Sequence, residues 1–234
     1  MKPCSLRFLG TGVILGLVFS ANIAGANPPT VPSSEGEARE ILTSKFEAQK
    51  RSIVQVKMDE ISAARKGNPK APIVIIEFTD FGCSRCQAFY LTTYPLIDSD
   101  LIKTGLVLYV SMNFYLGTPC HAKAALAAGN QGKYWEMKDL LFTSDRVPDE
   151  QVYADFAQKL KLDQEAFFAA YRSSEIAKEV ELEHTQGHEM GVVITPTFMV
   201  GWRLPDGMFV GTRISGPKPW TFFRDLVNQM ANVQ

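Results

Sequence analysis

Two cysteines separated by two residues carry the clearest chemistry in this sequence. Cys83 and Cys86 follow an apolar stretch and stand where a helical pattern begins. This spacing lets the two sulfurs close a disulfide across the first turn of a helix. Free backbone N–H groups and the positive end of the helix dipole stabilise a thiolate on the first cysteine, and a thiolate is the species that attacks a disulfide. The pair therefore predicts thiol–disulfide exchange, with Cys83 attacking and Cys86 resolving the mixed disulfide.

A CxxC pair can also be half of a zinc site, which normally needs a second pair of ligands. The chain contains no second CxxC. His184 and His188 are spaced as neighbours on one helix face and could complete a Cys₂His₂ set with the two cysteines. Solvated helix polarity is the commoner explanation of such a histidine pair. We therefore predict no metal and no cofactor, and a metal-handling protein is kept as the alternative.

The elements that would hold the cysteine pair follow a β-α-β order and later a β-β-α order. The first strand is a continuous apolar, β-branched run that predicts a buried central strand. A helical pattern follows Cys86 to about residue 97, and a last helix opens after two closely spaced prolines and ends at about residue 230. The predicted strands are residues 73–78, 106–114, 192–200 and 208–214.

A helix-rich stretch separates these two halves. From about residue 118 to 188 the composition is dominated by Ala, Leu, Phe, Glu and Lys, without β-branched runs. This order is typical of an α/β domain with a helical insertion. We therefore predict one α/β domain over residues 67–234, preceded over residues 27–66 by a flexible leader and an N-terminal helical extension.

The predicted extension is a helix-compatible stretch from Ser34 to Lys66. Its apolar residues form an interrupted amphipathic pattern, which suits packing on the domain and self-association about equally. A homo-oligomer through residues 33–66 is therefore one expectation, and a packing helix is the other. The pattern consists of Leu42, Phe46, Ile53 and Val56.

Residues 1–26 are typical of a secretory signal peptide. Lys2 and Arg7 precede an uncharged run over residues 8–19, and small residues then lead to an A-x-A cleavage pattern that ends at Ala26. The run is shorter than the roughly 20 residues of a membrane-spanning helix. We predict cleavage after Ala26 and a periplasmic location, where a disulfide can persist.

The composition excludes several classes of protein. Hydrophobic residues make up 46% and charged residues 21% of the 234 residues, which argues against a disordered or collagenous chain. A net charge of −1 argues against a nucleic-acid partner. Four cysteines are too few for a disulfide-built scaffold, so the fold must rest on a hydrophobic core. Outside the CxxC pair and the signal segment, Cys120 is left over, and a buried free thiol is its expected state.

Two segments of the chain resemble one known family. Residues 77–86, E-F-T-D-F-G-C-S-R-C, resemble the active-site segment of the DsbA-like, thioredoxin-fold disulfide oxidoreductases of bacterial envelopes. Residues 194–198, I-T-P-T-F, are similar to the family segment whose proline is cis and faces the CxxC pair. The resemblance covers about residues 67–231. It implies a thioredoxin-like fold, cysteine-containing envelope proteins as substrates, and a membrane redox partner that recycles the cysteines.

The resemblance also implies roles for single residues. Cys83 would be the nucleophile and Cys86 the resolving cysteine. Pro196 would be the cis-proline, and Thr195 before it would offer its backbone to an extended substrate beside the disulfide.

Two further positions belong to the candidate site. Glu77 would match the family's buried acid, a proton relay for Cys86; the alternative is an acid at a strand end that reaches solvent. Arg85 would favour the Cys83 thiolate if its side chain points toward the sulfur. The dipeptide Ser84-Arg85 leaves open whether the protein forms, reduces or rearranges disulfides. An oligomeric isomerase or chaperone is therefore a further alternative.

Overall fold

The computed structural model describes residues 29–45, 52–61, 63–117, 119–144 and 149–233. The predicted signal peptide, residues 1–26, lies outside the described residues.

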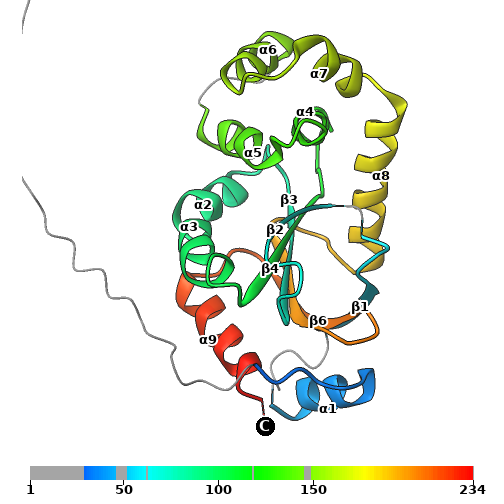
Figure 1. Cartoon of the computed structure of the whole chain (residues 1–234), viewed down its shortest axis with the longest axis vertical. Helices are drawn as coiled ribbons and strands as arrows, with labels where there is room; N and C mark the ends of the chain where they lie inside the picture. Colours follow the sequence, from blue (N-terminus) through cyan, green and yellow to red (C-terminus); the bar gives the residue numbers. More distant parts are fainter. Residues whose placement is uncertain (1–28, 46–51, 62, 118, 145–148, 234) are drawn as a thin grey trace, which may run out of the picture.

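A mixed six-stranded sheet in the order β1-β6-β5-β3-β4-β2 occupies the centre of the molecule (Figure 1). The central strand β3 pairs in parallel with β4 and antiparallel with β5. Every residue of β3 and β4 is buried, as the continuous apolar run predicts for a strand covered on both faces. The strands are β1 (Ile53–Lys57), β2 (Ala64–Gly67), β3 (Ile73–Thr79), β4 (Val107–Asn113), β5 (Thr197–Arg203) and β6 (Met208–Ser215).

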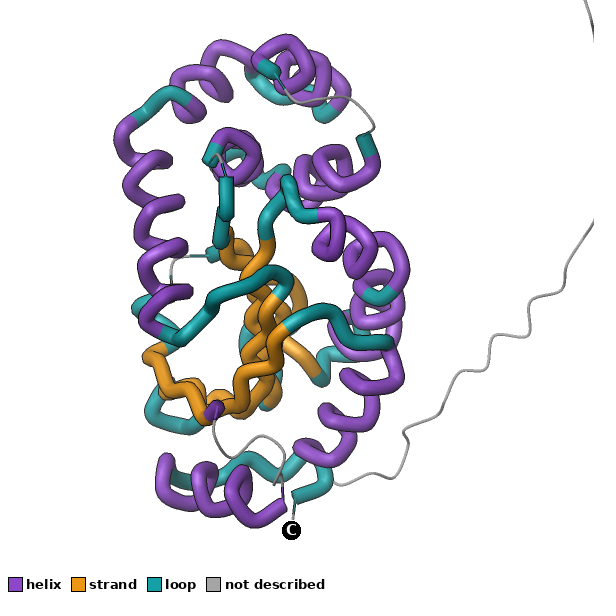
Figure 2. Tube along the Cα trace, turned by 180° about the vertical axis from the view of Figure 1, so that it is seen from behind, coloured by secondary structure: helices purple, strands orange, loops and turns teal. Residues whose placement is uncertain are grey.

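Helices cover both faces of this sheet. In Figures 1 and 2, α2, α3 and α9 run along one side and α8 along the other, while α4, α5, α6 and α7 gather at one end. The described helices are α1 (Glu35–Lys45), α2 (Ser84–Thr92), α3 (Tyr94–Ile97), α4 (Cys120–Gly129), α5 (Tyr134–Thr143), α6 (Glu150–Lys159), α7 (Gln164–Tyr171), α8 (Ser174–Glu189) and α9 (Trp220–Ala231), and a π-helical turn (Asp98–Ile102) follows α3.

The alternation of side chains along β3 divides the core into two layers. Ile73 and Ile75 pack in the layer that contains α2, α3 and α9, whereas Val74 and Ile76 face the opposite layer. Burying each of these side chains stabilises the fold by about 1.5–3 kcal/mol. The strand that leads into Cys83 is therefore anchored from both sides.

The predicted helical insertion is present. Helices α4 to α8 lie between residues 120 and 189, and α4 to α7 with the first half of α8 enclose a third core cluster. The fold class, an α/β thioredoxin-like fold with a helical insertion, is confirmed. None of the helices in the described part of the chain is long and apolar enough to cross a bilayer.

The N-terminal stretch differs from the predicted helix between Ser34 and Lys66. The described helix α1 ends at Lys45, and Ile53–Lys57 and Ala64–Gly67 are edge strands of the sheet. The reason is that β-branched residues in β1 gain ladder hydrogen bonds and packing from β6, which outweigh a weak amphipathic helix pattern. Strands from before residue 67 thus belong to the same sheet, and the domain boundary at residue 66 stays a prediction.

Candidate active site

Cys83 stands at the N-terminus of helix α2, directly after the turn that follows β3. Its backbone is extended, with φ −90° and ψ 115°, and its carbonyl accepts the Gln87 N–H at 3.0 Å, so it is the N-cap residue of the helix. Cys83 is half-buried and Cys86, inside the first turn, is fully buried. The structure thus places the two cysteines on the helix start that the sequence predicts.

The environment of Cys83 favours its thiolate. Burial opposes the charged form, but the side chain of Thr195 and hydrogen bonds from Cys86 and from the backbone of Arg85 outweigh it, so the pKa of the thiol lies below its ordinary value. The Arg85 side chain is exposed, and its contribution comes through the backbone N–H rather than through the guanidinium. The Thr195 side chain and the backbone at the helix start therefore lower the pKa of this thiol.

The second sulfur has the opposite environment. Burial raises the pKa of Cys86 to about 12, and the negative charge of Glu77 adds to the rise. Hydrogen bonds from the Asp80 backbone and from the side chains of Thr195 and Thr79 reduce the shift without cancelling it. At neutral pH only about one Cys86 side chain in 10⁵ is a thiolate. The environment thus lowers the pKa of the Cys83 thiol and raises that of the Cys86 thiol.

The Thr195–Pro196 segment faces the cysteine pair from the other end of the sequence. The Thr195–Pro196 peptide bond is cis, as the resemblance implies. The Cys83 thiol donates to the Thr195 carbonyl, with a sulfur–oxygen distance of 3.5 Å. The Thr195 hydroxyl is buried and has no partner of good hydrogen-bond geometry among the described residues. The Thr195 side chain nevertheless lies close enough to both sulfurs to lower the pKa of each thiol. It is therefore available to a charged sulfur.

Glu77 is the buried acid of the two sequence alternatives. Its side chain is fully buried, and its Oε2 lies 2.6 Å from the ammonium of Lys138, which is also fully buried. Lys138 donates in addition to the Ser111 hydroxyl at 2.7 Å. Lys138, which comes from α5 in the helical insertion, is not among the residues predicted from the sequence. A signal existed, because Lys138 lies three residues after Trp135 and four before Phe142, on the apolar side of its helix.

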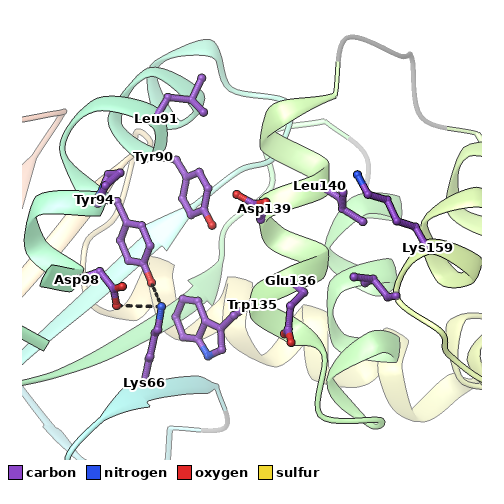
Figure 3. Close-up of a pocket in the computed structure, with 12 residues that line it drawn as sticks. Lys66, Tyr90, Leu91, Tyr94, Asp98, Trp135, Glu136, Asp139, Leu140 and Lys159 are labelled. Atoms are coloured by element: carbon purple, nitrogen blue, oxygen red, sulfur yellow. Dashed lines mark hydrogen bonds and ion pairs between the residues drawn. The ribbon is translucent and has the colours of Figure 1, made fainter. Parts of the chain in front are cut away.

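Aromatic rings surround the Lys138 ammonium. The ring centroids lie 5.5–5.9 Å from its nitrogen, a distance at which a desolvated cation is stabilised. Some of these rings also form the floor of a cavity of about 780 Å³ between α2 and α5 (Figure 3). Lys66 reaches into that cavity and bonds Asp98 and Tyr94. The rings around Lys138 are those of Tyr90, Tyr94, Trp135 and Phe142.

The remaining sequence candidates lie elsewhere. His184 stacks on the rings of Phe114 and Tyr115, and His188 contacts Phe114 edge-on. Among the described residues, no three His, Cys, Asp or Glu side chains gather as a metal site. Cys120, at the start of α4, is half-buried and forms no disulfide with another described cysteine.

Residues 60–207 match the protein-family model described as Thioredoxin. The chain belongs to the thioredoxin family. Its fold is similar to the crystal structure of Wolbachia pipientis alpha-DsbA1, with a TM-score of 0.66 and 22% identity over 73% of this chain and 91% of that one. This likeness confirms the fold that the two sequence segments imply.

Curated relatives match about three fifths of the chain. A probable disulfide bond formation protein D from Bacillus anthracis is 25% identical over 155 residues, 61% of this chain and 71% of that protein. The Na(+)/H(+) antiporter NhaA of Herminiimonas arsenicoxydans is 26% identical over 144 residues, 62% of this chain. This chain spans only 23% of the antiporter's length.

Proposed function

We propose that this chain is an exported thiol–disulfide oxidoreductase that acts on cysteine-containing proteins of the bacterial envelope through Cys83 and Cys86. The observation that carries the proposal is the position of Cys83 at a helix N-terminus, with a lowered pKa and 3.5 Å from the Thr195 carbonyl. Membership of the thioredoxin family and the likeness to disulfide bond formation protein D support it.

The exchange proceeds in two balanced steps. The Cys83 thiolate attacks one sulfur of a substrate disulfide, the substrate S–S bond breaks, and its second sulfur leaves as a thiolate. Cys86 then loses its proton and attacks Cys83, so that the Cys83–Cys86 disulfide forms and the first substrate sulfur leaves as a thiolate. The reverse sequence donates a disulfide. Throughout, an extended substrate segment lies beside the Thr195 backbone.

Glu77 is the group that takes the proton from Cys86 in this proposal. A thiol whose pKa is about 12 needs a base within reach, and the charge of Glu77 already acts on it. The Oε1 atom of Glu77 has no hydrogen-bond partner among the described residues, whereas Oε2 is held by Lys138. One oxygen is thus fixed while the other is free to accept.

The active cysteines are tested by single substitutions assayed with a disulfide-containing peptide. Cys83→Ala should abolish exchange, and Cys86→Ala should accumulate a mixed disulfide between Cys83 and the peptide, visible by mass. Cys120→Ala is the matched control and should retain exchange. Undiminished exchange by the Cys83→Ala protein would refute the proposal.

The direction of the reaction is decided by redox titration against glutathione. A reduction potential of about −120 mV for the Cys83–Cys86 pair would mean that the protein donates disulfides, and one of about −270 mV would mean that it reduces them. A membrane redox partner and a periplasmic location belong to the same proposal, and the N-terminal sequence of the exported protein should begin at residue 27.

The helix face that carries Ala38 and Leu42 is buried in its own domain, which favours a packing helix over an oligomerisation arm. Mass measurement in solution tests this preference.

A further inference from the structure

The carboxylate of Asp80 joins two loops beside Cys83. Its Oδ1 accepts the Gly82 N–H at 2.9 Å and its Oδ2 accepts the Leu116 N–H at 2.9 Å. Its backbone carbonyl accepts the Cys83 N–H at 3.1 Å. One residue therefore fixes the turn that delivers Cys83 to α2 and ties that turn to the loop after β4.

The loop after β4 is held independently at its start. The Phe114 N–H donates to the Thr79 carbonyl at 2.8 Å, and the Asn113 N–H donates to the buried carboxyl group of Glu183 at 2.6 Å. Leu116, by contrast, is 59% exposed, so few packing contacts hold its side chain. Tyr115 before it is held on α8, where it donates to Glu181 at 2.7 Å. The bond from Leu116 to Asp80 ties this loop to the cysteine turn.

We propose that Asp80 is a positioning residue for Cys83. The inference rests on the proposed function, since it concerns the same sulfur. The Asp80 side chain forms the Asx-type turn that places Cys83 as the N-cap of α2. At that position the backbone N–H groups of Arg85 and Cys86 favour the Cys83 thiolate. Without this turn the sulfur leaves those donors, and its pKa rises.

The sign of the pKa change separates positioning from a plain charge effect. Asp80 carries a negative charge near the sulfur, and removing a like charge lowers the pKa of a thiol. If Asp80 acted by charge alone, Asp80→Ala and Asp80→Asn would both lower the pKa of Cys83. Positioning predicts the opposite for Asp80→Ala, a rise of about one pH unit, which is about tenfold slower alkylation well below the pKa.

The test measures the alkylation rate of Cys83 by iodoacetamide against pH, with the Cys83 peptide quantified by mass spectrometry. All proteins are full-length and carry Cys86→Ser, so that no disulfide intervenes. Asp80→Ser keeps a hydroxyl that can bond Gly82 but is too short to reach Leu116, and it should give an intermediate rise. Asp59→Asn, at an exposed acid, is the control and should leave the curve unchanged.

An unchanged or lowered Cys83 pKa in both Asp80→Ala and Asp80→Ser would overturn the inference, provided that far-UV circular dichroism shows folded protein. If Asp80→Ala does not fold, Asp80→Ser alone decides by the same sign. The titration does not require enzymatic activity. A wild-type protein that exchanges no disulfides would therefore refute the proposed function while leaving the role of Asp80 to the titration.

Discussion

Burial of Glu183 should make the stability of this protein depend on pH in an unusual direction. Glu183 of α8 is fully buried, and its Oε2 accepts both the backbone N–H and the side-chain N–H of Asn113 at 2.6 Å. Burial raises the pKa of Glu183 from 4.5 to about 8, although the Asn113 bonds and Lys138 oppose the rise and Glu179 adds to it. At neutral pH the folded protein therefore binds a proton there that the unfolded chain has released.

The sign and size follow from this difference in bound protons. Because the folded-state pKa is raised, the contribution of Glu183 to stability is complete below pH 4.5 and is lost as the pH rises toward 8. At 1.36 kcal/mol per pH unit, the loss is about 3 kcal/mol at pH 7 and about 5 kcal/mol by pH 9. Marginal stabilities of about 5–15 kcal/mol make such a loss easy to measure.

Glu183→Gln removes the titration while it keeps the shape of the protonated acid. Its amide oxygen can accept from Asn113, and its NH₂ can donate to the Asn113 Oδ1, which has no partner among the described residues. Urea unfolding at pH 5, 7 and 9 should show near-equal stability at pH 5 and a growing advantage for the variant above it. Glu189→Gln, at an exposed position of the same helix, is the control. A difference between wild type and Glu183→Gln that is constant with pH would refute the reasoning.

Three other predictions follow from single contacts. Lys138→Met should destabilise the fold by about 3–5 kcal/mol in urea unfolding, because it leaves the charge of Glu77 buried and unpaired. Adding Glu77→Gln should recover a large part of that loss. At pH 8 iodoacetamide should label Cys83 and leave Cys86 unreacted, as counted by peptide mass, because Cys86 has a pKa of about 12. Gly187→Ala should cost about 1–3 kcal/mol of unfolding free energy, since its Cβ would meet an aromatic carbon at 2.5 Å.

Each of these has a result that would contradict it. Equal stability of wild type and Lys138→Met would mean that the ion pair contributes nothing. Labelling of Cys86 as fast as Cys83 would contradict the division of roles between the two sulfurs. For Gly187→Ala the matched comparison is Gly36→Ala, where the nearest atom lies 4.0 Å from an added Cβ. An equal change in unfolding free energy for the two variants would contradict a steric clash at Gly187.

The parts of the site that are local in sequence could be predicted from it. The CxxC spacing, the apolar run of β3 and the helix start describe a single stretch of chain, and Cys83 lies where that stretch predicts. The pairing of Lys138 with Glu77 and of Asp80 with Leu116 could not be predicted in the same way, because these partners meet only when distant segments pack. Edge strand β1 differs from the helix that the local pattern predicts, because its pairing with β6 is a long-range interaction that no local pattern contains.

The ion pair between Glu77 and Lys138 also limits how far this fold can be divided. The acid belongs to the central strand under the cysteines, and its counter-charge arrives from a helix of the insertion. A chain shortened to the sheet and its covering helices would retain both cysteines and the cis-proline. It would also contain a buried carboxylate without its cation, which is strongly unfavourable in a protein interior. Any minimal version of this protein must therefore replace Glu77 when it removes the insertion.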